Sequence, residues 1–591
     1  MNDMKRFLLT SVLSVLCTVA FAQSYRSMSI WHDSKATEYS LVAVDSVVFG
    51  DDGSVRVYKG TADDLFQSTD IDSVTVSVPS ITSTNKRNVK ELLDEFSGVS
   101  VNKNSYKTVG NNNPLMGHKF GADPFGMVDG DRVYVYMTDD HIYKSSNGQP
   151  VGDGDYSDCK KVSVISSEDL VNWTDHGAQP VAGSVGGPAT WANNMWAPCA
   201  AHKTIGGKEK YFLYFADNAS GIGVLTSDYP YGPWKQPSGM NQLISHSTPN
   251  CGGSAVPWLF DPAVMIDDDG KAYLYFGGGI DGLSAADPGS ARCVQLGDNM
   301  TSIVGEPQQI RPPYLFEDSG INKVGGKYIY SYCGNFSAGG TTATNPGSGN
   351  IGYMISDNPL GPFEYVGKCF DNPGSGWGGG GGNNHHAIFE FKGKYYILYH
   401  TRTLKSAMRK DYPVITDGME LRSTCVSEIQ VDTVNHKITN LAVSNMTISE
   451  ASVKQLKNFD PYQTVPGATM AWERGIETTY RTRLDKYAYC TAETKKGSWI
   501  CISNVEFGTD GPIAFTAKVK GKGIIKVCRA NPTTNSGSGI IALAEIPSTT
   551  TYKTITVPLV NIPPKTVSKL YLVFSDEASL ESWSFIKDGA E

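Results

Sequence analysis

Three acidic residues stand in apolar or glycine-rich stretches at widely separated positions of the chain. Asp123 and Asp261 each begin an Asp-Pro dipeptide, and Glu317 follows a Leu-Phe pair. A single Asp-Pro is typical of a turn, and that alternative applies to each position taken alone. Hydrolysis of an acetal needs one carboxyl that stays protonated, to donate to the leaving oxygen, and another that stays ionised, to activate water or attack carbon. Together the three acids favour this chemistry.

The surroundings of the acids suggest how they divide the work. Burial beside Phe316 and near another negative charge would raise the pKa of Glu317 and keep it an acid at neutral pH. Asp261 is the candidate for that charge. Asp123 is then the candidate base.

A repeated strand pattern predicts how these acids meet. Between residue 120 and about residue 402, a Gly, Asp or Lys turn followed by an alternating aromatic strand occurs five times, beginning at residues 133, 211, 272, 328 and 395. These spacings suit four-stranded blades and predict a five-bladed β-propeller over residues 98–445. Inner strands of a propeller converge on a central funnel, so acids at their starts would share one pocket. A large β-sandwich is the alternative.

The rest of the chain predicts four further segments. Residues 1–22 have the charged, apolar and small-residue layout of a secretory signal peptide, so export to the periplasm, cell surface or medium is expected; a membrane anchor is the alternative, but the apolar run is too short to span a bilayer. Residues 23–80 repeat at an offset of 27 and predict a small β-rich spacer or docking module. Residues 81–97 are predicted to be a linker. Residues 446–591 predict a separate β-sandwich.

Composition limits the partners of the protein. The formal net charge is −9 and only 19% of the residues are charged, which argues against binding to a nucleic acid backbone. The 30 Tyr and 62 Gly residues favour β structure with many turns. Neutral, hydroxyl-rich ligands fit this balance, and no membrane span is expected. The ten cysteines outside the signal segment lack zinc spacing and are interpreted mostly as core residues.

Five short stretches carry a resemblance to a known enzyme family. They are Gly121-Ala-Asp-Pro-Phe, Trp196-Ala-Pro, Phe260-Asp-Pro-Ala-Val, Phe316-Glu-Asp-Ser-Gly and, after a glycine run, Asn383-Asn-His-His-Ala. Together they resemble glycoside hydrolase family 43, most closely its arabinoxylan arabinofuranohydrolases with a C-terminal family 6 carbohydrate-binding module. The resemblance covers residues 113–445, continues more weakly to the C-terminus, and does not reach residues 23–97.

The resemblance implies a role for each acid. Asp123 takes the position of the general base, Glu317 that of the general acid, and Asp261 that of the pKa modulator and orienter. Hydrolysis in this family inverts the anomeric configuration, which needs about 6.5–9.5 Å between the base and acid carboxyls. The implied function is an exported hydrolase that removes α-L-arabinofuranosyl groups from arabinoxylan or its oligosaccharides. A β-xylosidase or arabinanase of the same family and a non-catalytic sugar-binding propeller are the alternatives.

The resemblance also implies binding residues. Trp196, Phe260, Asn384 and Arg402 are candidates for the wall of the sugar pocket, with core packing as the alternative for each. The family often holds one structural calcium ion, largely hydrated, in the propeller channel near a histidine, and His385 takes that position. A hydrogen bond from His385 to sugar or backbone is the alternative. No organic cofactor is expected.

The C-terminal module departs from its family's pattern. Pro466-Gly-Ala replaces the Glu-Ala-Glu that binds a structural calcium ion, and Ser579-Leu-Glu-Ser-Trp replaces the stretch with a sugar-binding Asn. Tyr489 and Tyr552 are candidates for stacking on a sugar, with core packing as the alternative. The module is therefore interpreted either as a sugar binder or as a brace for the propeller.

Overall fold

The computed structural model describes most of the chain. The residues described are 27–587, without 34, 41–43, 45, 50–52, 60, 61, 68, 78–80, 145–149, 154, 155, 280–284, 379–382, 416–419 and 481–489. The predicted signal peptide, most of the glycine run before Asn383, and Tyr489 therefore lie outside the described residues.

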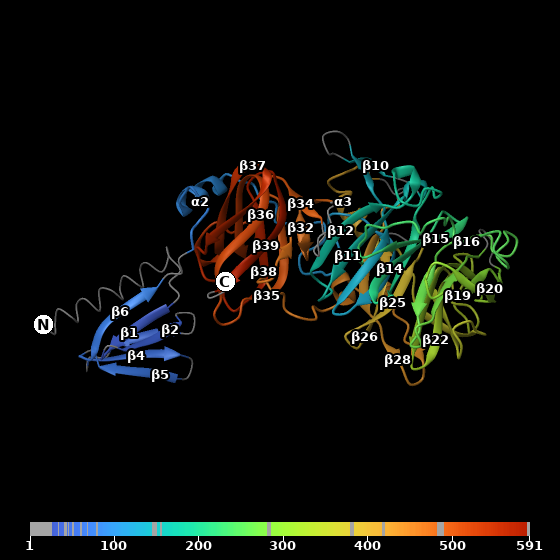
Figure 1. Cartoon of the computed structure of the whole chain (residues 1–591), viewed down its shortest axis with the longest axis horizontal. Helices are drawn as coiled ribbons and strands as arrows, with labels where there is room; N and C mark the ends of the chain where they lie inside the picture. Colours follow the sequence, from blue (N-terminus) through green and yellow to red (C-terminus); the bar gives the residue numbers. More distant parts are fainter. Residues whose placement is uncertain are drawn as a thin grey trace. The chain divides into compact units, whose positions relative to one another are not determined.

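Nearly all regular structure in the described residues is β, which confirms the predicted all-β class (Figure 1). The α-helices are short: α2 (Val89–Ser97), α3 (Thr403–Met408) and α4 (Ile448–Ala451). The chain forms two compact units. The larger contains residues 104–456 and 480–489, and the other contains residues 1–103, 457–479 and 490–591.

Five antiparallel sheets follow one another along the larger unit (Figure 1). The predicted aromatic strand is the second strand of each sheet, so all five predicted strands are confirmed. The sheets comprise β7 (Ala122–Asp129), β8 (Arg132–Thr138), β11 (Lys161–Ser167) and β12 (Trp173–Pro180); β13 (Trp196–Ile205), β14 (Lys208–Ala216), β15 (Gly221–Ser227) and β16 (Ile244–Ser245); β17 (Ala263–Ile266), β18 (Ala272–Phe276), β19 (Ala291–Leu296) and β20 (Ile303–Ile310); β21 (Leu315–Val324), β22 (Lys327–Gly334), β23 (Ile351–Ser356) and β24 (Glu364–Phe370); and β25 (His386–Phe391), β26 (Lys394–Thr401) and β27 (Ser423–Glu428).

Buried tyrosines of the second strands tie the first four sheets together. In each case the ring fills the core, and the hydroxyl donates a hydrogen bond to a backbone carbonyl in the turn that follows the third strand of the next sheet. This contact fixes the spacing of neighbouring sheets, and therefore of their first strands. The three pairs are Tyr136 with Pro230, Tyr214 with Met300 (2.7 Å), and Tyr275 with Pro359 (2.6 Å).

The other unit contains a nine-stranded sheet and two small sheets. The order of the large sheet is β32-β35-β38-β36-β39-β34-β33, with β30 on β39 and β37 on β36. Residues 27–77 form the three-stranded sheets β2-β1-β6 and β3-β4-β5, so both halves of the repeat contain strands. The bounds are β1 (Ser27–His32), β2 (Lys35–Ser40), β3 (Ser46–Phe49), β4 (Ser54–Lys59), β5 (Ala62–Gln67), β6 (Ile71–Ser77), β30 (Val465–Pro466), β32 (Trp472–Arg474), β33 (Glu477–Thr479), β34 (Thr491–Thr494), β35 (Trp499–Glu506), β36 (Pro512–Arg529), β37 (Ile540–Pro558), β38 (Thr566–Phe574) and β39 (Ala578–Lys587).

Residues 81–97, the predicted linker, contact strand β37. The Asn85 side chain donates to the carbonyl of Leu543 and accepts from the backbone N–H of Glu545, at 2.8 and 2.7 Å. Arg87 forms an ion pair with the same glutamate, at 2.9 Å. The polar side chains that made this segment look like a linker are thus hydrogen-bond partners of an edge strand. Helix α2 forms the second half of this segment, with Leu92 and Phe96 buried.

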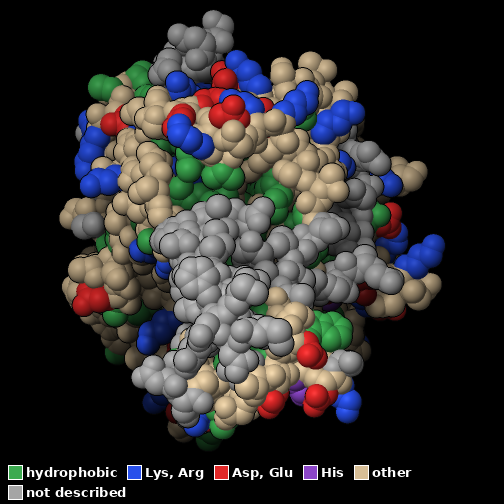
Figure 2. Space-filling view, turned by 90° about the vertical axis from the view of Figure 1, so that its left-hand side faces the viewer, with side chains coloured by type: hydrophobic (Ala, Val, Ile, Leu, Met, Phe, Trp, Pro, Cys, Tyr) green, Lys and Arg blue, Asp and Glu red, His purple; other side chains and the backbone are tan. Residues whose placement is uncertain are grey.

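The mixed charges on the surface and the burial of the cysteines fit the composition of the chain. On the face drawn in Figure 2, described Lys and Arg side chains are interspersed with Asp and Glu. All ten cysteines outside the signal segment are buried, as predicted for core residues. Within the described ranges, no helix is both long and apolar enough to cross a bilayer.

Candidate active site

The structure brings the three predicted acids together around one histidine. The Nδ1 atom of His385 lies 3.6 Å from Asp123 Oδ1 and 3.9 Å from Asp261 Oδ2. The backbone N–H of the preceding residue, Asn384, donates to Glu317 Oε1 at 3.2 Å. All three acids are buried, with 5–6% of their surface exposed. Acids from the first, third and fourth sheets therefore share one site.

An unusual backbone conformation recurs where these acids sit. At the start of the first strand in four successive sheets, one non-glycine residue has a positive φ: 49° at Asp123, 40° at Ala197, 49° at Asp261 and 70° at Asp318. In the first, second and fourth sheets the pairing register also shifts there, as in a β-bulge. A bulge re-aims the side chain away from the sheet, and such strain costs about 1–3 kcal/mol per residue. Three of the four strained positions carry a carboxylate.

Asp123 is held by a hydroxyl and a cation. Thr138 Oγ1 donates to its Oδ2, and Arg422 Nη1 donates to its Oδ1, both at 2.8 Å. The backbone N–H of Asp123 donates to His400 Nδ1 at 3.2 Å. These contacts fix the orientation of the carboxylate from three different strands or loops.

Arg422 is a site residue that the sequence did not reveal. Its Nε and Nη2 donate to the two oxygens of Asp140 at 2.9 Å, in a bidentate pair, while Nη1 reaches Asp123 and Asn383. Only 2% of Arg422 is exposed. Burial lowers the pKa of its guanidinium, but Asp123 and Asp140 outweigh this and raise it well above the ordinary value. Arg402, which was predicted as a wall residue of the sugar pocket, forms an ion pair with Glu420.

The pKa values of Glu317 and Asp261 are both raised at this site. Burial raises the pKa of Glu317 well above its ordinary range, and the charges of Asp261 and Asp123 raise it further. Burial also raises the pKa of Asp261, to about 7, with Asp123 adding to the effect and His385 opposing it. Both effects favour the protonated form of Glu317, in the direction expected from the sequence.

The predicted wall residues differ in what they offer a ligand. Phe260 is buried and packs edge-on against Trp258, with ring centres 5.5 Å apart. The Asn384 side-chain amide donates to the carbonyl of Gly349 at 2.8 Å, so this donor is used within the protein. Trp196 is half-buried. It is the one of these three side chains with a sizeable exposed surface.

Tyr156 forms an aromatic corner with Trp196 beside the acids. The Tyr156 ring lies 5.3 Å from the Arg422 guanidinium and 6.0 Å from the Trp196 ring, at a steep angle to the latter. Trp196 Nε1 and the Asn194 side chain both donate to the carbonyl of Tyr156, at 2.8 and 3.2 Å. The residue is 39% exposed. Sugar rings stack on such surfaces. No sequence signal distinguished Tyr156 from the many other tyrosines.

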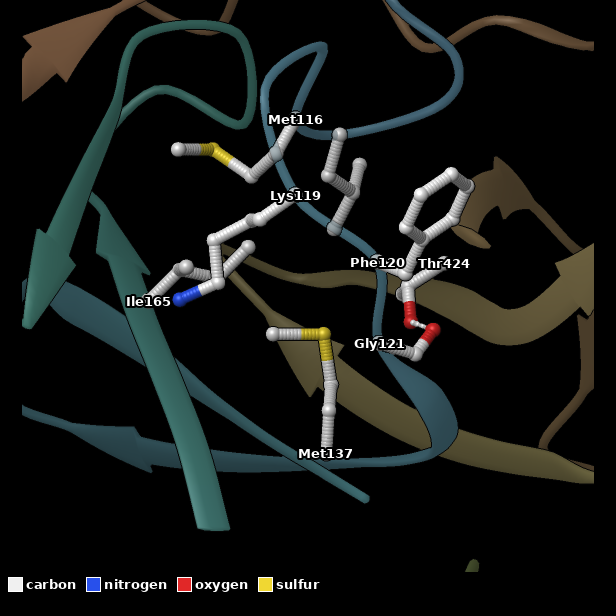
Figure 3. A pocket seen from close by; sticks show the side chains of 8 residues that line it. Met116, Lys119, Phe120, Gly121, Met137, Ile165 and Thr424 are labelled. Carbon is white, nitrogen blue, oxygen red and sulfur yellow. Dashed lines mark hydrogen bonds between the residues drawn. The ribbon is translucent and has the colours of Figure 1, made fainter. Parts of the chain in front are cut away.

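A small cavity next to Asp123 is separate from the acid cluster (Figure 3). Thr424 Oγ1 donates to the carbonyl of Gly121 across one side of it, at 2.9 Å. A Cβ atom at Gly121 would lie 2.6 Å from Met137 Sδ, so this position accepts only glycine without a shift. The lining has no carboxylate: it consists of Leu115, Met116, Lys119, Phe120, Gly121, Met137, Ile165 and Thr424.

The residues around His385 bear on the calcium expectation. Its Nε2 lies 3.1 Å from Asp318 Oδ1, so both ring nitrogens face carboxylates. Burial lowers the pKa of His385, but Asp318, Asp261 and Asp123 outweigh this and raise it. Among the described residues, no group of three or more His, Cys, Asp or Glu side chains is arranged to hold a metal ion. Direct ligation of calcium by these side chains therefore does not fit.

Comparisons with known proteins agree with this geometry. The model for glycosyl hydrolases family 43 matches residues 112–430. An arabinoxylan arabinofuranohydrolase of Paenibacillus polymyxa is 43% identical over 448 residues, covering 72% of this chain and 67% of that protein. One of Bacillus subtilis is 45% identical over 426 residues, covering 70% of this chain and 79% of that protein.

A solved structure extends the similarity beyond the catalytic region. The crystal structure of a family 43 arabinoxylan arabinofuranohydrolase from Bacillus subtilis, in complex with cellotetraose, matches with a TM-score of 0.73 and 38% identity. The match covers 82% of this chain and 99% of that one. The protein belongs to glycosyl hydrolases family 43.

Proposed function

We propose that this protein is an inverting α-L-arabinofuranosidase that removes arabinosyl side groups from arabinoxylan or its oligosaccharides. The observation that carries the proposal is the meeting of Glu317, whose pKa is raised, with Asp123 and Asp261 around His385. A site that only bound sugar would have no need of a carboxyl whose pKa is raised in this way. The names of the relatives at 43–45% identity support the choice of substrate.

Each acid takes one step in the proposed reaction. Glu317 donates its proton to the glycosidic oxygen as the bond from that oxygen to the anomeric carbon breaks. Asp123 takes a proton from water as the water oxygen bonds to the opposite face of that carbon, which inverts its configuration. Asp261 acts through Glu317, because its negative charge favours the protonated acid. Trp196 and Tyr156 offer their exposed rings to the sugar.

We further propose that the five sheets are the blades of a five-bladed β-propeller and that the C-terminal sheet is a β-sandwich related to family 6 carbohydrate-binding modules. Support comes from the sheet order along the chain and from the tyrosine contacts between successive sheets.

The Tyr552 hydroxyl pairs with Ser579 Oγ at 2.6 Å and Lys520 lies 5.1 Å from its ring, so this tyrosine is anchored on its strand.

The activity assay uses three glycans. Purified protein is incubated separately with arabinoxylan, debranched arabinan and xylo-oligosaccharides, and the products are followed by proton NMR. We expect free arabinose from arabinoxylan, first as the inverted anomer, and none with Glu317→Gln. Xylose as the product would favour the second candidate, a β-xylosidase, which a 30% identical xylosidase/arabinosidase of Bacteroides ovatus supports. Binding without release from any glycan would favour a sugar-binding protein.

We propose that any calcium ion near His385 is held through water and that no organic cofactor takes part. A water-mediated ion contributes modestly, so we expect dialysis against EDTA to lower kcat/KM by about threefold, with recovery in calcium but not magnesium. A loss of more than a hundredfold would instead indicate direct ligation.

We also propose export with removal of residues 1–22, which N-terminal sequencing of the mature protein would check by finding Gln23 first.

A further inference from the structure

A fourth carboxylate, Asp318, lies next to the proposed general acid. It is fully buried, and its backbone N–H donates to Asp261 Oδ2 at 2.9 Å. One carboxylate oxygen lies 3.1 Å from His385 Nε2. The other accepts from both the backbone N–H and the ring Nδ1 of His386. Asp318 thus connects two successive histidines to the acid cluster.

The contacts of Asp318 continue into the core. His386 Nε2 pairs with Ser331 Oγ at 2.8 Å, and at most 2% of either residue is exposed. The order Ser331, His386, Asp318 has the atoms of a serine-hydrolase triad, but a serine this deeply buried in strand β22 is closed to substrate. A Cβ atom at Gly320 would lie 2.5 Å from Ser331 Oγ, so glycine leaves the space that this chain of contacts occupies.

The other end of the chain of contacts reaches the catalytic cluster. The His385 ring has Asp318 at one nitrogen and Asp123 and Asp261 at the other. The contact of Nε2 with Asp318 is an ion pair rather than a hydrogen bond, since no hydrogen-bond partner of Asp318 Oδ1 is found among the described residues. An ion pair with a fixed carboxylate favours one orientation of the imidazole ring, and such supporting contacts tune a neighbouring catalytic group. Without the ion pair, the His385 ring would be free to rotate away from Asp123 and Asp261.

We propose that Asp318, itself held by His386 and Ser331, is a positioning residue that fixes the His385 ring between Asp123 and Asp261. The proposal rests on the proposed function of the site. Its consequence is a graded series: Asp318, which touches His385, and His386, whose Nδ1 donates to Asp318, matter most, and Ser331 matters least because it is three contacts away from His385.

The test compares four variants of the full chain: Asp318→Asn, His386→Leu, His386→Asn and Ser331→Ala. The chain of contacts from Ser331 to His385 orients groups that react rather than groups that hold sugar. We therefore expect Asp318→Asn and His386→Leu to lower kcat on arabinoxylan about 30-fold, with KM within about twofold. Asparagine can place an N–H near the position of Nδ1, so His386→Asn should keep most of the wild-type kcat. Ser331→Ala should lower kcat by about threefold.

A second readout does not depend on turnover. In protein labelled with ¹⁵N-histidine, we expect the Nε2 chemical shift of His385 to change in Asp318→Asn and His386→Leu and to stay near its wild-type value in His386→Asn. Thermal unfolding of each variant shows that the comparison is made on folded protein. The proposal is overturned if His386→Asn behaves like His386→Leu in both readouts, or if the His385 shift is unchanged by loss of Asp318. Absence of sugar release by the wild type would count against the proposed function. The NMR result would then decide separately whether Asp318 positions the His385 ring.

Discussion

Glu317→Gln is expected to lower kcat on arabinoxylan by about 10³-fold, while the affinity for arabinoxylan oligosaccharides stays within about twofold. Glutamine keeps the size of the side chain and can still accept the hydrogen bond from the Asn384 backbone. It cannot transfer a proton to the leaving oxygen. Steady-state kinetics and isothermal titration calorimetry on the same preparation measure the two quantities.

Two further measurements, with a better leaving group and over a range of pH, identify proton donation as the step that the Glu317→Gln variant lacks. An aryl arabinofuranoside with an acidic phenol needs little protonation, so Glu317→Gln should lose far less activity on it. Because the pKa of Glu317 is raised, wild-type activity should persist at neutral pH and fall on the alkaline side as the acid ionises, and the variant should lack that limb. The exposed acid variant Glu428→Gln is the matched control. Equal loss of turnover and of sugar affinity would assign Glu317 a structural or binding role instead.

Arg422→Met is expected to destabilise the protein by about 3–5 kcal/mol and to remove its activity. The methionine fills much of the same volume but leaves Asp123 and Asp140 buried without their cation. Urea unfolding followed by tryptophan fluorescence measures the first effect, and arabinose release measures the second. The matched control is Arg311→Met, whose ion pair with Asp287 is largely exposed and should contribute less than about 1 kcal/mol.

A double variant separates stability from activity at this arginine. Asp140→Asn combined with Arg422→Met removes one of the two uncompensated charges, so part of the lost stability should return. Activity should not return, because Asp123 still lacks the donor that holds its Oδ1. Recovery of both would mean that Arg422 acts only through folding, and that the orientation of Asp123 does not depend on it.

Sequence patterns alone predicted the strands and the acids of this protein. Alternation of aromatic residues after turns is a local property, so five second strands could be predicted from it. Asp123, Asp261 and Glu317 stood out because an acid in an apolar stretch is costly and therefore unusual. Their meeting in one site followed from the inference that strands of successive sheets converge. The raised pKa of Glu317 followed from the same convergence.

The polar residues that complete the site became apparent from the folded chain and not from the sequence. Arg422 lies 299 residues from Asp123 along the chain, and nothing local distinguishes it from the other arginines. The contacts of residues 81–97 could not be predicted for the same reason, because Arg87 meets Glu545 only through folding, across 458 residues. Local patterns report backbone preference and burial. The pairing of charges depends on which distant strands the folded chain places side by side.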